Sequence, residues 1–308
     1  MSKRIQFYIT ARGWGALFLL LLASCRPATP LLTQTPGIRE PSPTSVPLQT
    51  APQPSPTPPP TEVPLAARVD ENGITLLEYQ SELALYKAAK GTELAPEDEQ
   101  RVLDDLIDQT LLAGAAEQKG FMVDEALLDE RIGLLVGQLG SEEALASWLS
   151  TYQYDQPTFR RALRRSVAAA WMRDQIASGV PPTAEQVHAR QILLYNSEQA
   201  AEIYRQLEAG NSFRNLALQY DPLTGGDLGW FPRGYLPDPN VEQAAFNLQP
   251  EVYSPVIETA AGFIILQVLE SDPQRPLSPE ALLVLQTQAV QTWLEGRRSE
   301  AQIEILVQ

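Results

Sequence analysis

A long proline-rich stretch near the N-terminus sets the first limit on what this chain can fold into. Thirteen of the 39 residues from 26 to 64 are proline. Proline lacks the amide hydrogen that helices and sheets need, and this composition cannot bury a hydrophobic core. The segment is therefore predicted to be an extended spacer rich in polyproline II, with folded sequence beginning near Ala66. A proline-rich ligand for a partner domain is the alternative interpretation of the same residues.

The residues before the spacer are typical of an export signal. Three basic residues precede an apolar run from residue 14 to 23. The run is shorter than the roughly 20 residues of a membrane-spanning helix and fits a signal-peptide core. It ends in Leu-Ala-Ser-Cys at 22–25, which resembles the bacterial lipobox. The resemblance implies cleavage before a lipidated Cys25, and the alternative is an ordinary signal sequence or short anchor with a chance cysteine.

The charge and the rare residue types exclude several classes of function. The formal net charge is −15. An excess of carboxylates argues against binding to nucleic acid, which needs Lys and Arg to displace counterions, and against broad adhesion to anionic lipid. The chain has one cysteine and one histidine. An internal disulfide and a Cys/His metal site are therefore not expected.

The first part of the folded sequence is predicted to be mainly helical. A short strand and a turn at 71–73 precede the first helix. Apolar residues then recur at helical spacing from Val102 to Leu111, Asp124 is positioned as an N-cap, and Pro157 opens a long helix that ends near Gly179. Four arginines cluster on this long helix, and a solvated helix face is favoured for them over a specific anion or peptide site: Arg160, Arg161, Arg164 and Arg165.

The pattern changes after Pro182 to strands alternating with short helices. The order strand-helix-helix-strand-helix-strand predicts a compact α+β domain of about ninety residues. A final amphipathic helix is expected from Glu280 to Glu295, and an alternating stretch after it reads as a strand. Because the helix must bury its apolar stripe, it is predicted to return to the first helical region. The last strand is expected to pair with the stretch Ala-Arg-Val-Asp at 67–70.

Three stretches of the α+β segment resemble the parvulin-type (PpiC, rotamase) peptidyl-prolyl isomerases. They are GGDLGWFPRG at 225–234, EQAAFNLQPE…YSPVIET at 242–259 and AGFIILQV at 261–268. The whole layout is similar to extracytoplasmic SurA/PrsA-type foldases, whose helical part binds unfolded chains. The resemblance implies an α+β fold in which a four-stranded antiparallel sheet with helices is inserted between a helical region and a returning C-terminal helix. It implies no cofactor and no metal.

These interpretations divide the chain into five parts. The predicted boundaries are a lipoprotein signal peptide at 1–24, a lipidated cysteine and disordered linker at 25–64, a helical chaperone-like domain at 65–182, a parvulin-like domain at 183–272, and a C-terminal helix and strand at 273–308.

The resemblance also implies the walls of a substrate pocket. The leucine of the GGDLG motif that lines the family's proline pocket is Leu228. The pocket methionine falls on Leu236, and the pocket phenylalanine falls near Val241, beside a one-residue insertion. Phe246 matches the family's helix phenylalanine.

The polar positions of the family site are only partly kept. The family's acid or cysteine has Asp221 as its nearest counterpart, at the start of a shortened loop, and Thr259 matches a hydroxyl at the site. The two family histidines fall on Gln191 and Ile264. Gln191 can still form hydrogen bonds but cannot titrate, and Ile264 can do neither.

The only histidine of the chain, His188, is not expected to replace them. It lies three positions before Gln191, and strand side chains alternate between the two faces of a sheet. An odd offset therefore places the two side chains on opposite faces. His188 is predicted to point away from the pocket.

The sequence is compatible with three functions to different degrees. The first is a membrane-anchored extracytoplasmic isomerase that helps exported proteins fold, with weak catalysis because both family histidines are replaced; its partners are unfolded or proline-containing polypeptides and the membrane. The second is a non-catalytic chaperone or holdase with a degenerate parvulin domain. The third, a solute-binding lipoprotein, predicts two α/β lobes, for which residues 66–180 offer almost no strands.

Overall fold

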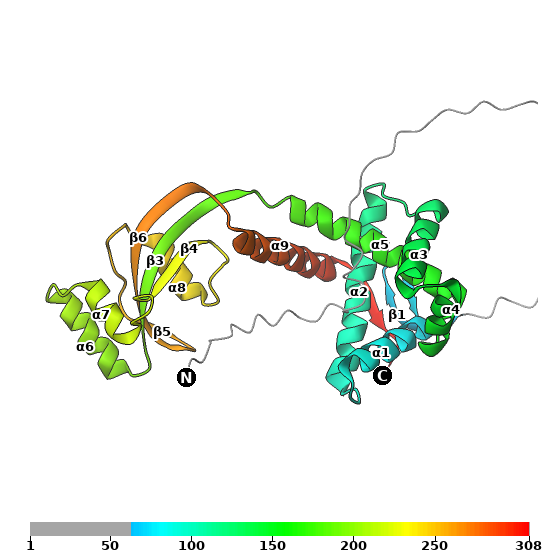
Figure 1. The fold of residues 1–308 in the computed structure, drawn as a ribbon, viewed down its shortest axis with the longest axis horizontal. Coiled ribbons are helices and arrows are strands. Elements are labelled where there is room, and N and C mark those ends of the chain that lie inside the picture. The colour runs from blue at the N-terminus through cyan, green and yellow to red at the C-terminus, as the bar shows by residue number, and fades with distance from the viewer. Residues whose placement is uncertain (1–62, 308) are drawn as a thin grey trace, which may run out of the picture.

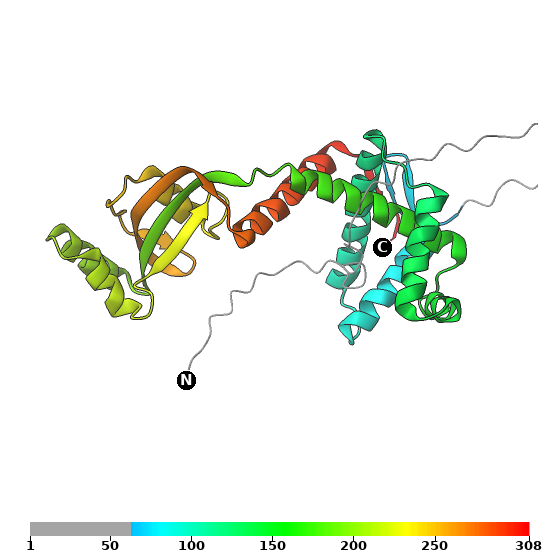
Figure 2. The same ribbon diagram turned by 45° about the horizontal axis from the view of Figure 1, so that its top comes forward.

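A computed structural model describes residues 63–307. The predicted signal peptide, Cys25 and nearly all of the proline-rich spacer lie outside the described residues. The described chain forms two lobes along the long axis of the molecule, and both views show that helix α9 and the end of helix α5 run between them (Figures 1 and 2). Helix α5 leads into the second lobe and α9 returns from it.

The first lobe combines helices with one small sheet. Its elements are β1 (Leu65–Val69), β2 (Asn72–Thr75), α1 (Leu76–Lys90), α2 (Pro96–Gln118), α3 (Glu125–Leu139), α4 (Glu142–Thr151), α5 (Gln156–Ser178), α9 (Pro279–Glu300) and β7 (Ile303–Ile305). Side-chain caps begin the helices where the sequence places them. Asp124 accepts a hydrogen bond from the Leu127 N–H and starts α3, and Asp155 does the same for α5 through the Thr158 N–H.

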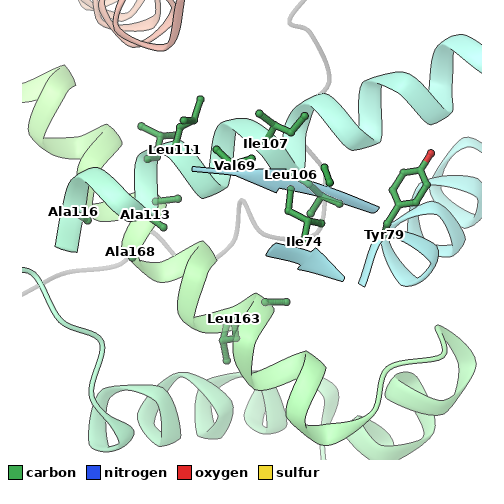
Figure 3. Packing of buried hydrophobic residues seen from close by; sticks show 14 of the residues in the cluster. Val69, Ile74, Tyr79, Leu106, Ile107, Leu111, Ala113, Ala116, Leu163 and Ala168 are labelled. Atoms are coloured by element: carbon green, nitrogen blue, oxygen red, sulfur yellow. The ribbon is translucent and has the colours of Figure 1, made fainter. Parts of the chain in front are cut away.

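The core of this lobe lies between the small sheet and helices α2 and α5. Figure 3 shows Val69 and Ile74 on the strands, Leu106 and Ile107 on α2, and Leu163 on α5. All five side chains are at most 1 % exposed. The helical period predicted for the α2 segment is confirmed, because its apolar positions form the buried face of that helix.

The sheet of the first lobe joins the two ends of the folded chain. Its order is β2-β1-β7, and Ala67 to Val69 pair with Ile303 to Ile305 in antiparallel register. The predicted pairing of the last strand with the first is therefore confirmed. The predicted turn at 71–73 is wrong in part, because Asn72 and Gly73 already belong to β2, which pairs back onto β1.

The prediction of a solvated arginine face on α5 is wrong in part, because Arg161 is exposed but the other three arginines pair with carboxylates. Arg160 donates to both Glu125 and Asp129 of α3, and Arg164 also pairs with Glu125. Arg165 is paired with the buried Glu78 of α1 at 2.7 Å. The sequence shows four arginines on one helix, but the carboxylates that pair with three of them come from other helices.

The C-terminal helix returns to the first lobe, as predicted, and is longer than predicted. It runs to Glu300, and Val290 and Leu294 are buried in the core of the first lobe. Arg298 near its end donates to Asp104 and Asp108 of α2. Packing against α2 and α5 thus extends the helix beyond the apolar stripe that the sequence displays.

The second lobe is built on a four-stranded antiparallel sheet. Its elements are β3 (Thr183–Leu194), α6 (Ser197–Glu208), α7 (Phe213–Tyr220), β4 (Asp227–Pro232), α8 (Pro239–Asn247), β5 (Ile257–Thr259) and β6 (Gly262–Pro276). The strand order is β4-β3-β6-β5, and every neighbouring pair is antiparallel. The predicted α+β fold, with this sheet inserted between the helical region and the returning helix, is confirmed.

Helices cover both faces of this sheet, so the lobe has two cores. Helices α6 and α7 pack on one face, over Ile192, Leu194 and Ile265. Helix α8 packs on the other face, over Val187, Ala189 and residues of β6. The face on which a strand residue lies therefore decides which of two surroundings its side chain enters.

Candidate functional site

The central strand β3 places Gln191 and His188 on opposite faces of the sheet. Ala189 and Leu193 pack in the core under α8, and Gln191 between them shares their face. Ile192 and Leu194 pack under α6 and α7, and His188 shares that face, where it lines a pocket with Arg214 of α7. The predicted orientation of the only histidine, away from Gln191, agrees with this geometry.

The predicted pocket residues come together in one apolar cluster under α8. Leu228 from β4, Leu236 from the β4–α8 loop and Phe246 from α8 are half-buried there. Val241 and Ile264 belong to the same cluster but are buried, at 3 % and 7 % exposed. The first three side chains therefore offer the accessible apolar surface, while the other two form the floor beneath it.

Two charged or aromatic neighbours complete this apolar wall. The ring of Phe246 meets the ring of buried Phe231 edge-on at 6.0 Å between centroids. On the outside, the Arg233 guanidinium lies 4.1 Å from the centroid of the Phe246 ring and pairs with Glu185. Such a cation over a ring face restrains the ring. Arg233 stands in the motif stretch at 225–234, but nothing in the sequence shows that it reaches Phe246.

The loop that carries Leu236 is held by a single carboxylate. Glu242 of α8 accepts hydrogen bonds from three successive backbone N–H groups, those of Gly234, Tyr235 and Leu236, at 2.8 to 3.1 Å. Such an arrangement fixes the path of a loop more tightly than any one contact. Glu242 was not predicted as part of the site, because no motif links an acidic residue to N–H groups six to eight positions before it.

Helix α9 of the first lobe contacts the same loop. The Gln288 side-chain amide donates to the carbonyl oxygen of Gly234. Burial and the nearby Glu280 carboxylate raise the pKa of the Tyr235 phenol above its ordinary value. Gly234 has φ +81°, and a Cβ there would lie 2.7 Å from Gln288 Oε1. The wall that carries Leu236 is thus fixed from both lobes.

Gln191 is linked to the glycine-rich loop through its backbone. Its N–H donates to the carbonyl oxygen of Gly226 at 2.8 Å. A Cβ on Gly226 would come within 1.8 Å of the Gln191 carbonyl oxygen. Only glycine permits this approach. The Gln191 side chain is half-buried and forms no hydrogen bond to another described residue.

Asp221 organises this loop with its carboxylate. It accepts from the N–H groups of Leu223, Thr224 and Gly226, and from the Thr224 hydroxyl. The Thr224 hydroxyl and these N–H groups hold the pKa of Asp221 below its ordinary value. The carboxylate therefore stays ionised and is already fully bonded, which makes it an anchor for the loop at Gly226 rather than a proton donor.

Thr259 lies at the turn between β5 and β6. Its hydroxyl donates to the Gly262 carbonyl oxygen at 2.9 Å and accepts from the Ala261 N–H at 3.2 Å. Both bonds close the turn. The hydroxyl thus shapes the strand connection that leads into Ile264, and its bonding capacity is used locally.

His188 has its own set of partners on the other face. Its Nε2 lies 2.9 Å from Asp227 Oδ1, and its ring stacks on Trp230 at 5.5 Å between centroids. Partial burial raises the pKa of Asp227, but hydrogen bonds from the Gly229 N–H and His188 outweigh it and leave that pKa below the ordinary value. These contacts tie β3 to β4 and place the imidazole outside the apolar cluster.

The apolar cluster is suited to chemistry that breaks no covalent bond. Rotation about a peptide C–N bond is opposed by a resonance barrier of about 18–20 kcal/mol. A surface that holds a proline ring and removes water from its amide disfavours the polar planar amide relative to the twisted form. The Gln191 side-chain amide forms no hydrogen bond to another described residue and can donate one. In the described part of the chain, no group of three or more His, Cys, Asp or Glu side chains is placed to hold a metal ion.

The second lobe matches a known family. Residues 188–270 match the family model described as "Rotamase: PPIC-type PPIASE domain". Together with the four-stranded antiparallel sheet and the apolar wall under α8, the match identifies this lobe as a PpiC-type rotamase domain.

The relatives of the chain are foldases and chaperones by name. It is 29 % identical over 206 residues to the Chaperone SurA of Alcanivorax borkumensis, covering 56 % of this chain and 47 % of that relative. It is 27 % identical over 192 residues to the Foldase protein PrsA of Halalkalibacterium halodurans, covering 55 % and 57 %. The chain spans about half the length of these curated relatives.

One solved structure is also similar to part of the chain. The crystal structure of Peptidylprolyl Isomerase (PrsA) from Bacillus cereus is 17 % identical, covers 73 % of this chain and 86 % of its own, and gives a TM-score of 0.45.

None of the helices at residues 63–307 has the length and apolar composition needed to cross a membrane.

Proposed function

We propose that this protein is an extracytoplasmic foldase with peptidyl-prolyl cis-trans isomerase activity, whose clients are unfolded or proline-containing exported polypeptides. The observation that carries the proposal is the apolar wall of Leu228, Leu236 and Phe246 on the same face of the sheet as Gln191, within a domain that matches the rotamase model. The foldase and chaperone names of the relatives support the wider role.

Catalysis is expected to be weak. A glutamine in place of the first family histidine keeps a hydrogen-bond donor at the site, but Ile264 in place of the second removes one. The wall can still desolvate a prolyl amide, and desolvation needs no titrating group. A holdase that binds peptide without isomerising it is the second candidate, and the replacement of both histidines favours it.

Exchange spectroscopy on a short Ala-Pro peptide separates the two. The wild-type chain should accelerate cis-trans exchange, and Leu228→Asp should return the rate to the uncatalysed value because a carboxylate would hydrate the wall. Leu283→Asp, at a leucine that is exposed on α9, is the matched control and should leave the rate unchanged. Suppressed aggregation of an unfolded client without any acceleration would identify a holdase and reject the enzyme.

We also propose that the chain is anchored to a membrane through lipidated Cys25, with the proline-rich segment at 26–64 as the spacer. The proposal rests on the lipobox-like sequence at 22–25. The Cys25→Ala variant should leave the membrane fraction and appear in the soluble fraction after cell lysis. Retention of the variant in the membrane fraction would reject the lipid anchor.

A further inference from the structure

The face of the rotamase sheet opposite the apolar wall carries a groove that the proposed function does not use. Two pockets of about 320 and 340 Å³ lie along it, and both are lined by Arg190 of β3 and Arg214 of α7. The volumes fit one or two side chains each. Because the pockets share these two arginines, the two pockets together are called the arginine groove.

The guanidinium groups in this groove are not neutralised by hydrogen-bonded partners. Arg190 Nε is buried and has no hydrogen-bond partner. Arg214 is exposed and forms no ion pair or hydrogen bond with another described residue. By contrast, Arg160, Arg233 and Arg298 are all paired with carboxylates. Among the described residues, Arg190 and Arg214 thus line the pockets without a carboxylate that is hydrogen-bonded or ion-paired to them.

The carboxylates close to the groove are already engaged or lie at its edge. Asp227 lines the groove and interacts electrostatically with Arg190, but its Oδ1 accepts from His188 and the Gly229 N–H. Glu251 lines the far end and is exposed, and Glu270 lies 3.6 Å from His188 Nδ1. The planar donors of the two arginines remain available for a carboxylate from outside the chain.

The rim of the groove beside the arginines is apolar. Leu218 of α7 and Leu223 of the following loop line it and are 38 % and 95 % exposed. The loop is held in place because the Asp221 carboxylate bonds its backbone, so Leu223 is presented to solvent by a fixed turn. An arginine pair next to exposed leucines matches a ligand that has both a negative charge and an apolar side chain.

We propose that the arginine groove is a second polypeptide-binding site, which takes a segment with an aspartate or glutamate side chain on Arg190 and Arg214 and a neighbouring apolar side chain on Leu218 and Leu223. The site goes beyond the proposed isomerase function, since Gln191 and the apolar wall face the other side of the sheet. It gives the rotamase domain a preference for acidic, apolar stretches that need not contain proline.

Calorimetric titration of the purified chain with two peptides tests the proposal. The first peptide is acetylated and amidated Leu-Glu-Leu-Leu-Asp-Leu, and the second has Gln and Asn in place of Glu and Asp. The acidic peptide should bind about tenfold more tightly, the free-energy scale of one charge-assisted contact. Its affinity should fall as salt is raised. Equal affinities for the two peptides would overturn the proposal.

Variants locate the binding. Arg214→Gln should weaken the acidic peptide about tenfold; this exposed side chain has no partner whose loss would unfold α7. Arg190→Gln provides the second arm. Arg205→Gln on α6, an exposed arginine paired only with Glu202, is the matched control and should bind as wild type does. Unchanged binding by Arg214→Gln would overturn the proposal.

Two further binding measurements distinguish this site from the isomerase site and from a site for small anions. Leu228→Asp should keep the affinity for the acidic peptide even where it abolishes prolyl exchange, and loss of peptide binding in that variant would overturn the proposal. Inorganic phosphate alone should bind more weakly than the peptide. Phosphate binding of equal or greater strength would show a site for free anions and would also overturn it.

Discussion

At the scale of single residues, Gly226 lies so close to the backbone of Gln191 that a Cβ on it would come within 1.8 Å of the Gln191 carbonyl oxygen. It has φ +74°, and a Cβ there would meet the backbone of Gln191, which cannot move without breaking β3 away from its neighbours. Gly226→Ala should therefore lower the free energy of unfolding by about 2–5 kcal/mol, the combined cost of a left-handed alanine and of overpacking. Urea unfolding followed by circular dichroism measures the loss.

Gly229 supplies the control for that substitution. It has φ +69°, but a Cβ there would meet no atom within 4 Å. Gly229→Ala should cost only the conformational strain of about 1–2 kcal/mol. If the two variants lost the same stability, the contact with Gln191 would not be what requires glycine at position 226.

Residue by residue, the family resemblance predicted which apolar side chains lie together better than it predicted the hydrogen bonds of the polar groups. Leu228, Leu236 and Phe246 were predicted as neighbours and form one wall. The hydrogen bonds of Asp221 and Thr259 were not predictable, because the sequence does not show whether a carboxylate or hydroxyl is bonded to nearby backbone groups. Glu242 was missed for a related reason, since its partners are backbone N–H groups, which no side-chain pattern reveals.

At the scale of elements, periodicity predicted the long helices and the strong strands, and long-range pairing decided the rest. Helix α2 and strand β6 each display a clear apolar pattern. Strand β2 has only four residues and contains Asn72 and Gly73, which favour turns, so pairing with β1 makes it a strand. Three of the four α5 arginines depend in the same way on Glu125 and Glu78, which lie on other helices.

Helix α2 contains a partly buried carboxylate, Asp105, and burial disfavours its ionised form. Desolvation, followed by the like charge of Asp108, raises the pKa of Asp105 to about 6. The ordinary value is about 3.9, so the folded state binds the proton more tightly than the unfolded state. Asp105 therefore favours folding below pH 4, and its contribution is lost as the pH rises through about 6.

Asp105→Asn should remove this pH-dependent penalty. At pH 7.5 the variant should be more stable than wild type by about 1 kcal/mol, a value reduced for the solvent that still reaches the group. The difference should vanish near pH 3.5. Asp104→Asn is the comparison variant, and its stability should change in the opposite direction. It breaks the ion pair with Arg298 and should therefore destabilise the folded protein at pH 7.5. Urea unfolding at both pH values distinguishes them, and a variant no more stable than wild type at pH 7.5 would contradict the raised pKa.

At the scale of the whole molecule, the described residues form three separate hydrophobic cores, one in the first lobe and two in the second. The core of the first lobe shares no residue with the two clusters of the second lobe. Helix α9 belongs to the first core through Val290 and Leu294, although it follows the second lobe in sequence. In Figure 1 it reaches from the edge of one lobe to the other, and its Gln288 bonds to the Gly234 loop. The second lobe is thus inserted into the sequence of the first lobe, while the core of the first lobe remains continuous in space.

Separate cores predict separate unfolding. Leu294→Ala should lower the free energy of unfolding of the first lobe by about 2–5 kcal/mol, because it leaves a cavity in a closed core. Amide hydrogen exchange in β3 and β6 should change by less than about 0.5 kcal/mol, the scale expected for distant sites. Ile265→Ala should produce the reverse pattern, with faster exchange in the second lobe and unchanged exchange in α2. Leu283→Ala, at an exposed position of α9, controls for the substitution itself and should change neither lobe. Equal loss of protection in both lobes for Leu294→Ala would mean that α9 and the Gln288 contact make the molecule a single cooperative unit, and that binding in one lobe is felt directly in the other.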